Sequence, residues 1–287
     1  MRQCKNVSEG IMRGLFMAAA CVCILAVGVI CYFLFANGLP FFAQYAVSDF
    51  ISGKEWAPLR GVFGILPMIV GSFVITLGAL LLGAPAGVLT AIMMARFSSG
   101  KAVRLMKPAV ALLAGIPSVV YGFFGLMLLV PFTRSILGGD GLSILVAAIL
   151  LAIMILPTII QTSRAAIEAV PNAYYEGSLA LGASHESSVF RAILPAARSG
   201  IVSGIVLGIG RAIGETTAVL MVAGNQARLP TSLLKGVRAL TVNVLLEMGY
   251  AADLHRASLI ATGVILFVIV MAVNIIFSFY NRRRVLQ

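Results

Sequence analysis

The stretch from residue 141 to residue 163, GLSILVAAILLAIMILPTIIQTS, decides the fold class of this chain. It runs for 23 residues without a charged side chain, and about 20 apolar residues are enough for a helix to cross the hydrocarbon core of a bilayer. Four more uncharged runs, and a fifth that only Arg211 and Glu215 interrupt, resemble it. These five cover residues 14–36, 61–95, 108–133, 199–227 and 257–281. The six runs predict an all-α membrane protein with six transmembrane helices.

The composition of the whole chain agrees with this reading. Sixty per cent of its 287 residues are hydrophobic and 11% are charged, and the mean hydropathy is +1.04. A soluble domain of this length needs far more polar surface. The net charge of +11 does not indicate nucleic-acid binding, because most Lys and Arg stand at the ends of apolar runs and no basic face carries interleaved aromatics.

Cysteine and histidine give no sign of a disulfide framework, a metal site or another cofactor. All four cysteines lie in or before the first apolar run, where a disulfide framework is not expected. The two histidines are far apart in the sequence and read as ordinary loop residues. These residues are Cys4, Cys21, Cys23, Cys31, His185 and His255.

The basic residues predict the orientation in the membrane. The N-terminal tail, the loop around residues 96–107, the loop 164–198 and the C-terminal tail together hold 13 Lys and Arg, and the alternate loops hold 7. The richer side normally faces the cytoplasm, so both termini are expected inside. We read the first run as a retained helix rather than a signal peptide, because its apolar stretch is too long and lacks a clear cleavage site. Residues 1–60 then form a first helix with an outer loop, and residues 61–287 form a five-helix core.

The loop between the fourth and fifth runs has the pattern of two short helices. Asn172 after Pro171 suits a helix cap, Gly182 suits a left-handed turn, and a second short helix over 184–193 is expected to end at Leu194-Pro195. From the residues alone, this helical hairpin either rests on the lipid surface or contacts a partner protein. The side chains that it offers for such contact are Tyr174, Tyr175, Leu179 and Phe190.

Arg211 and Glu215 form the second informative feature, because ionisable residues at membrane depth are costly and usually face a pore or a partner. A spacing of four places both on one face of a continuous helix, where they can pair. One interpretation is a salt bridge that makes the helix tolerable. The other is an anion path, in which Arg211 presents its fork of donors to an oxyanion and Glu215 holds the arginine in place.

The hairpin loop resembles that of ABC importer permeases. Glu176, Gly182, Leu194 and Pro195 match the spacing of the family's Glu-Ala-Ala…Gly…Ile-x-Leu-Pro loop. The chain departs from this pattern with Gly177-Ser178 in place of the two alanines and with Ala192 in place of the isoleucine. The resemblance implies the type I permease fold with a cytoplasmic coupling loop that docks into an ATPase subunit, with Tyr175 and Leu179 beside the matched positions.

Over roughly residues 60–284 the chain resembles the permeases of phosphate-specific ABC importers. This resemblance rests on GRAIGETTAVLMVAGN at 210–225, IPSVVYG at 116–122 and the Arg238…Glu247 segment of the outer loop. It implies phosphate passage past Arg211, Glu215 and the adjoining Thr216. It also implies a heterodimer with a sister permease, a dimer of ATP-binding subunits inside and a phosphate-binding protein outside. The chain itself would catalyse no reaction, and no Walker loop appears in it.

Three alternatives stay open at this point. The same machine could carry another oxyanion such as molybdate, sulfate or a phosphonate. An ion-gradient-driven secondary transporter would need no docking loop and would favour inverted internal repeats, of which none of note appears. A membrane scaffold would not need Arg211 and Glu215 at membrane depth.

Overall fold

The structure is a computed structural model that describes residues 2–285. It does not describe the side chains of residues 1–11, 278 and 280–287. Those of Cys4 and of Arg282–Arg284, used above, therefore lie outside the described residues.

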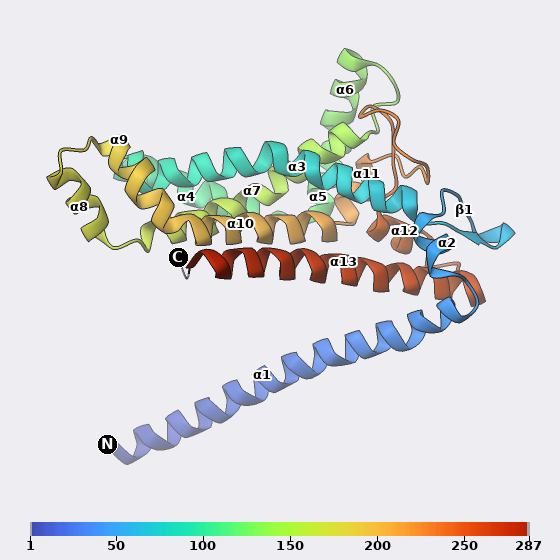
Figure 1. Cartoon of the computed structure of the whole chain (residues 1–287), viewed down its shortest axis with the longest axis horizontal. Coiled ribbons are helices and arrows are strands. Elements are labelled where there is room, and N and C mark those ends of the chain that lie inside the picture. Colours follow the sequence, from blue (N-terminus) through green and yellow to red (C-terminus); the bar gives the residue numbers. More distant parts are fainter. Residues whose placement is uncertain (1, 286–287) are drawn as a thin grey trace.

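The chain folds almost entirely into helices, as the apolar runs predict (Figure 1). Six spans are long and apolar enough to cross a membrane, which confirms the fold class. They are Met12–Ala43, Leu66–Phe97, Ser118–Leu137, Ile144–Glu168, His185–Gly214 and Asp253–Phe277.

The first half of the chain contains α1 Arg2–Gly38, η1 Leu39–Ala43, α2 Val47–Ser52, β1 Trp56–Ala57, η2 Pro58–Arg60, β2 Val62–Phe63, α3 Leu66–Ile92, η3 Met93–Phe97, α4 Gly100–Gly115, α5 Ser118–Phe124, η4 Gly125–Leu129 and α6 Val130–Leu137. The second half contains α7 Ile144–Glu168, α8 Asn172–Ala180, α9 His185–Ser188, η5 Val189–Ile193, α10 Leu194–Gly214, α11 Thr217–Val222, α12 Leu240–Glu247 and α13 Asp253–Val285.

The decisive run forms α7, the central helix of the core. Ser143 caps it by accepting a hydrogen bond from the backbone N–H of Val146. Helices α3 and α10 pack against α7, and glycines bring the backbones together. A Cβ at Gly87 of α3 would lie 2.8 Å from the Ile159 side chain, and one at Gly200 of α10 would clash with that of Ala166. Small residues at such contacts let membrane helices approach closely.

The glycines of α10 that stand four residues apart face α7. Gly204 and Gly208 join Gly200 in facing α7, whereas Gly210 has open space around it. Close packing of α10 on α7 therefore uses Gly200, Gly204 and Gly208.

Helix α1 lies apart from the core over most of its length. It contacts α13 near its C-terminal end, where Phe35 and Phe267 meet edge to face and a Cβ at Gly38 would touch Val264. Figure 1 shows the N-terminal half of α1 diverging from α13. A division after about residue 60 remains a prediction.

The segment between α1 and α3 folds into a small cap with its own aromatic core. Its strands β1 and β2 pair antiparallel, with Trp56 opposite Phe63. Phe41, Phe50 and Phe63 are fully buried there and pack ring against ring. In Figure 1 this cap and α12 lie at the opposite end of the molecule from α8 and α9.

Candidate functional site

Arg211 lies in the last turn of α10, half-buried between helices. Its Nη1 donates to the hydroxyl of Thr158 in α7 over 3.3 Å. Thr158 is a neutral partner, so this hydrogen bond orients the guanidinium and leaves its charge unbalanced. No motif or spacing pointed to Thr158, which stands 53 residues from Arg211.

Glu215 does not pair with Arg211, and the expectation that it holds the arginine in place is wrong for this structure. Helix α10 ends at Gly214, and Glu215 has an extended backbone with ψ 126°. The carboxylate instead accepts from the backbone N–H of Ala218 over 3.2 Å and so caps α11. None of the ion pairs among the described side chains joins the two residues. A spacing of four brings two side chains together only while the helix is continuous.

Thr216 lies in the break between α10 and α11, and its hydroxyl donates to the carbonyl of Gly214 over 3.2 Å. A second break, at Ile116-Pro117, separates α4 from α5. The helices that follow the two breaks touch, because a Cβ at Gly122 of α5 would lie 3.1 Å from the Cα of Ala218 in α11. Non-helical backbone at membrane depth is tolerated where it is buried in protein or lines a cavity. Paired breaks beside Arg211 therefore mark this region as a candidate substrate path.

A cavity of about 410 Å³ opens between α4 and α7 on the side of the hairpin loop. Its polar lining comes from Lys107, Gln161, Arg164 and Glu168. Arg164 is paired with Glu168 over 2.7 Å. Thr158 and Arg164 are about 9 Å apart along the axis of α7, at 1.5 Å per residue, so this cavity begins within two helical turns of Arg211.

The predicted hairpin forms between α7 and α10, with some different boundaries. Helix α8 begins at Asn172, but Pro171 is the N-cap residue and no side chain caps the helix, so the expected Asn172 cap is absent. Gly182 takes the predicted left-handed conformation with φ +85°. The expected second short helix does not end at Leu194-Pro195, because Pro195 sits in the first turn of α10, where its missing N–H is not needed.

The predicted docking residues divide into two groups. Glu176, Leu179 and Gly182 are exposed, as is Pro195. Tyr175 and Leu194 instead pack against the buried cluster around Val189 and Ile193. These two support the loop from inside, and the exposed residues face outward.

His185, expected to be an ordinary loop residue, holds the hairpin to α3. Its Nδ1 lies 2.8 Å from the hydroxyl of Tyr175, and its ring meets that of Phe97, in η3 at the end of α3, at 4.9 Å between centroids. Through these two contacts His185 links α8 to the end of α3. No sequence spacing links His185 with Phe97.

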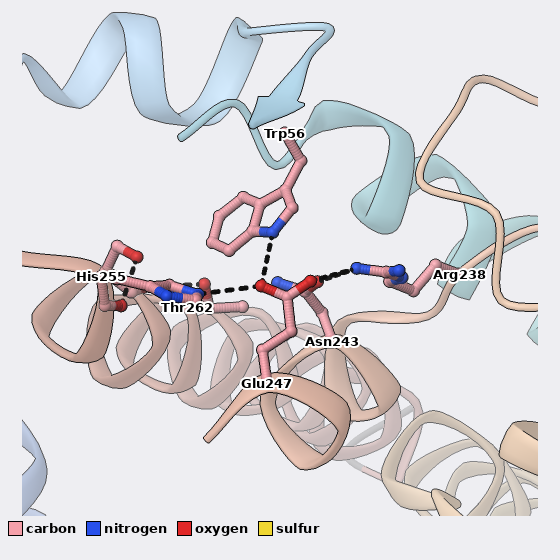
Figure 2. Close-up of polar contacts among 7 residues, drawn as sticks. Trp56, Arg238, Asn243, Glu247, His255 and Thr262 are labelled. Carbon is pink, nitrogen blue, oxygen red and sulfur yellow. Dashed lines mark hydrogen bonds and ion pairs between the residues drawn. The ribbon is translucent and has the colours of Figure 1, made fainter. Parts of the chain in front are cut away.

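A second polar cluster lies at the other end of the molecule, around Glu247 of α12. Figure 2 shows its carboxylate between the indole of Trp56, the guanidinium of Arg238 and the ring of His255. Arg238 and Glu247 belong to the segment that carried the family resemblance. Trp56 and His255 were not recognised as members of the cluster, because Trp56 stands 191 residues from Glu247.

Comparison with known proteins identifies the family to which this chain belongs. Residues 87–285 match the family model described as "Binding-protein-dependent transport system inner membrane component". The probable ABC transporter permease protein YqgH of Bacillus subtilis is 36% identical over 99% of this chain and 94% of its own length. The phosphate transport system permease protein PstC of Mesorhizobium japonicum is 32% identical over 92% of this chain and 86% of its own.

Solved structures agree on the fold. A chain from a bacterial ABC transporter involved in the import of alginate superposes with a TM-score of 0.60, at 16% identity, over 97% of this chain and 99% of that one. A chain of the MetNI methionine ABC transporter gives 0.58 at 21% identity, over 80% of this chain and 99% of that one. The six spans, the broken helices and the hairpin loop are thus those of an ABC permease, and the chain belongs to the family of binding-protein-dependent transport system inner membrane components.

Proposed function

We propose that this chain is the permease subunit of an ATP-driven importer of inorganic phosphate. Arg211 carries the proposal, because its guanidinium is half-buried beside a helix break and is ion-paired with none of the described residues. A charge at such depth is costly unless a counter-charge arrives, and the planar fork of arginine matches the oxygens of phosphate. Relatives named as phosphate permeases favour phosphate over other oxyanions.

The inner cavity fits the same path. Lys107 and Arg164 offer positive charge on the way from Arg211 to the cytoplasm, and Glu168 partly neutralises Arg164. A conducting path has to bind its ion strongly enough to admit it and weakly enough to release it. A partly neutralised cationic exit meets that condition.

The proposed partners would bind at the two ends of the molecule and beside the path. The exposed hairpin around Gly182 would dock on a dimer of ATP-binding subunits, which would hydrolyse ATP in place of this chain. A sister permease would complete the path, and a phosphate-binding protein would deliver the ion from outside. Both termini would face the cytoplasm, as the basic residues indicate.

Uptake of labelled phosphate tests the proposal, in cells stripped of their own high-affinity phosphate systems. The cells would carry this chain with its sister permease, ATPase and binding protein. Arg211→Gln is expected to lower uptake at least about tenfold, because hydrogen bonds to charged groups contribute about 1.5–3 kcal/mol. Arg134→Gln, at the exposed end of α6, is the matched control and should leave uptake unchanged.

The outcomes separate the alternatives. Full uptake by an assembled Arg211→Gln complex would remove Arg211 from the anion path. A wild-type complex that takes up sulfate or molybdate but no phosphate would keep the path and replace the substrate.

A further inference from the structure

Glu247 is a buried carboxylate that joins three separate segments of the outer side. Its side chain is 8% exposed. One oxygen accepts from Nη1 of Arg238 over 2.6 Å. The other accepts from the indole N–H of Trp56 over 2.8 Å and lies 2.9 Å from Nε2 of His255. These partners come from β1, from the segment before α12 and from the start of α13.

Arg238 also makes hydrogen bonds to several separate groups. Its Nε donates to the carbonyl of Asn225 over 3.1 Å, and its Nη1 also donates to the side-chain oxygen of Asn243 over 3.0 Å. The backbone of Arg238 lies against α3, where a Cβ at Gly71 would come within 2.7 Å of its carbonyl oxygen. Arg238 therefore fixes the turn after α11 to both α12 and α3.

Helix α12 connects this cluster to the helix break at Glu215. At its start, Leu240 donates its N–H to the hydroxyl of Ser72 in α3 over 2.9 Å, and Thr241 donates its hydroxyl to the carbonyl of Glu215 over 3.2 Å. At its end stands Glu247. The helix has eight residues and so spans about 12 Å. One short helix therefore joins Glu247 to the break at Glu215.

We propose that Glu247 is a positioning residue for transport: with Arg238, Trp56 and His255 it forms an outer latch that holds α12, and through it the Glu215 break, in a closed outer arrangement. Opening the path to the outside has to part the Arg238–Glu247 pair or move α12. A buried ion pair with several further hydrogen bonds is suited to such a role, because losing one partner leaves the other charge unpaired. The latch rests on the proposed transport function but does not depend on the substrate being phosphate.

The test uses the full transporter in proteoliposomes and measures ATP hydrolysis without binding protein or phosphate. Glu247→Gln keeps the shape of the side chain and removes its charge. If the latch holds the outer side closed, weakening it favours the open state, and basal hydrolysis is expected to rise about tenfold, the ratio that corresponds to about 1.4 kcal/mol. Arg238→Gln should give a similar rise, and the double variant should add little, because both changes break one pair.

Glu55→Gln is the matched control, since Glu55 forms an exposed ion pair with Arg60 in the same outer cap. Exposed pairs contribute little, so its basal hydrolysis should stay at the wild-type level. A purely structural role for Glu247 would lower the amount of complex or all rates together, but would not raise the basal rate. An assembled Glu247→Gln complex with wild-type basal hydrolysis would overturn the proposal.

Trp56→Phe keeps the test decisive if Glu247→Gln prevents assembly. It removes one neutral donor from the latch and keeps the Arg238–Glu247 pair, so a smaller rise of about threefold is expected, within the range for one hydrogen bond. No rise in this variant would equally contradict the latch. Because basal hydrolysis needs no substrate, a wild-type complex that fails to import phosphate would refute the proposed substrate alone.

Discussion

At the scale of single residues, the position of Arg211 is expensive, and its partner does little to reduce the cost. A charged side chain at the centre of a membrane helix costs about 2.5–3.5 kcal/mol on insertion scales. Thr158 gives it one neutral hydrogen bond, while the carboxylate of Glu215 is used to cap α11. The charge of Arg211 is therefore available to a ligand, which a salt bridge within α10 would have prevented.

Thr158 should matter for transport because it orients Arg211. Thr158→Val keeps the shape of the side chain and removes the acceptor. We expect an apparent KM for phosphate uptake about tenfold higher, as for about 1.5 kcal/mol lost from a hydrogen bond to a charged group. Thr158→Ser, which keeps the hydroxyl, should have the wild-type KM.

The matched control for Thr158→Val is Thr90→Val in α3. The hydroxyl of Thr90 donates to the carbonyl of Ala86 in its own helix, so this change should leave the KM unaltered. An unchanged KM for Thr158→Val would show that Arg211 is oriented by other contacts.

At the scale of elements, the hairpin between α7 and α10 depends on one backbone conformation. Gly182 has φ +85°, and the turn is closed by its N–H on the carbonyl of Leu179 and by that of Ala183 on Ser178. Residues with a Cβ pay about 1–2 kcal/mol in this region. The turn between α8 and α9 therefore depends on a glycine whose backbone conformation, and not lack of space for a Cβ, disfavours other residues.

Gly182→Ala is expected to weaken coupling between ATP hydrolysis and uptake about 5- to 30-fold, the ratio that corresponds to about 1–2 kcal/mol. Uptake per ATP hydrolysed in proteoliposomes is the measurement. Gly177→Ala is the control: Gly177 lies within α8 with open space around it, and alanine is the better helix former. Equal behaviour of the two variants would show that the turn conformation is not what docks.

The elements also show how far sequence patterns reach. Hydropathy located all six spans, because crossing a bilayer needs a long apolar run whatever packs around it. Pro117 is the sequence signal for the break between α4 and α5, because proline removes a backbone hydrogen-bond donor. The break at Glu215 has no proline, and the RAIGE spacing alone suggested an unbroken helix. Tertiary contacts decide it, among them the bond from Thr241 to the carbonyl of Glu215.

At the scale of the whole molecule, the hairpin of α8 and α9 lies at one end of the helical core, and α12 with Glu247 lies at the other (Figure 1). His185 holds the hairpin to α3 at one end, and Ser72 of the same α3 receives the start of α12 at the other. Helix α3 therefore links the surface where an ATPase would push with the latch at the outer side. Alternating access needs a connection between the ATPase surface and the outer side, and α3 provides it if the hairpin faces the cytoplasm.

Cysteine labelling tests that orientation directly. Once the four native cysteines are replaced by serine, Leu59→Cys places a fully exposed thiol on the outer cap and Leu181→Cys places one, at a position 91% exposed, on the tip of the hairpin. A membrane-impermeant maleimide added to intact cells should label the first variant and reach the second only after the membrane is opened, because the side richer in Lys and Arg stays inside. The opposite pattern would turn the hairpin away from any cytoplasmic ATPase, and the proposed import of phosphate would lose its source of energy.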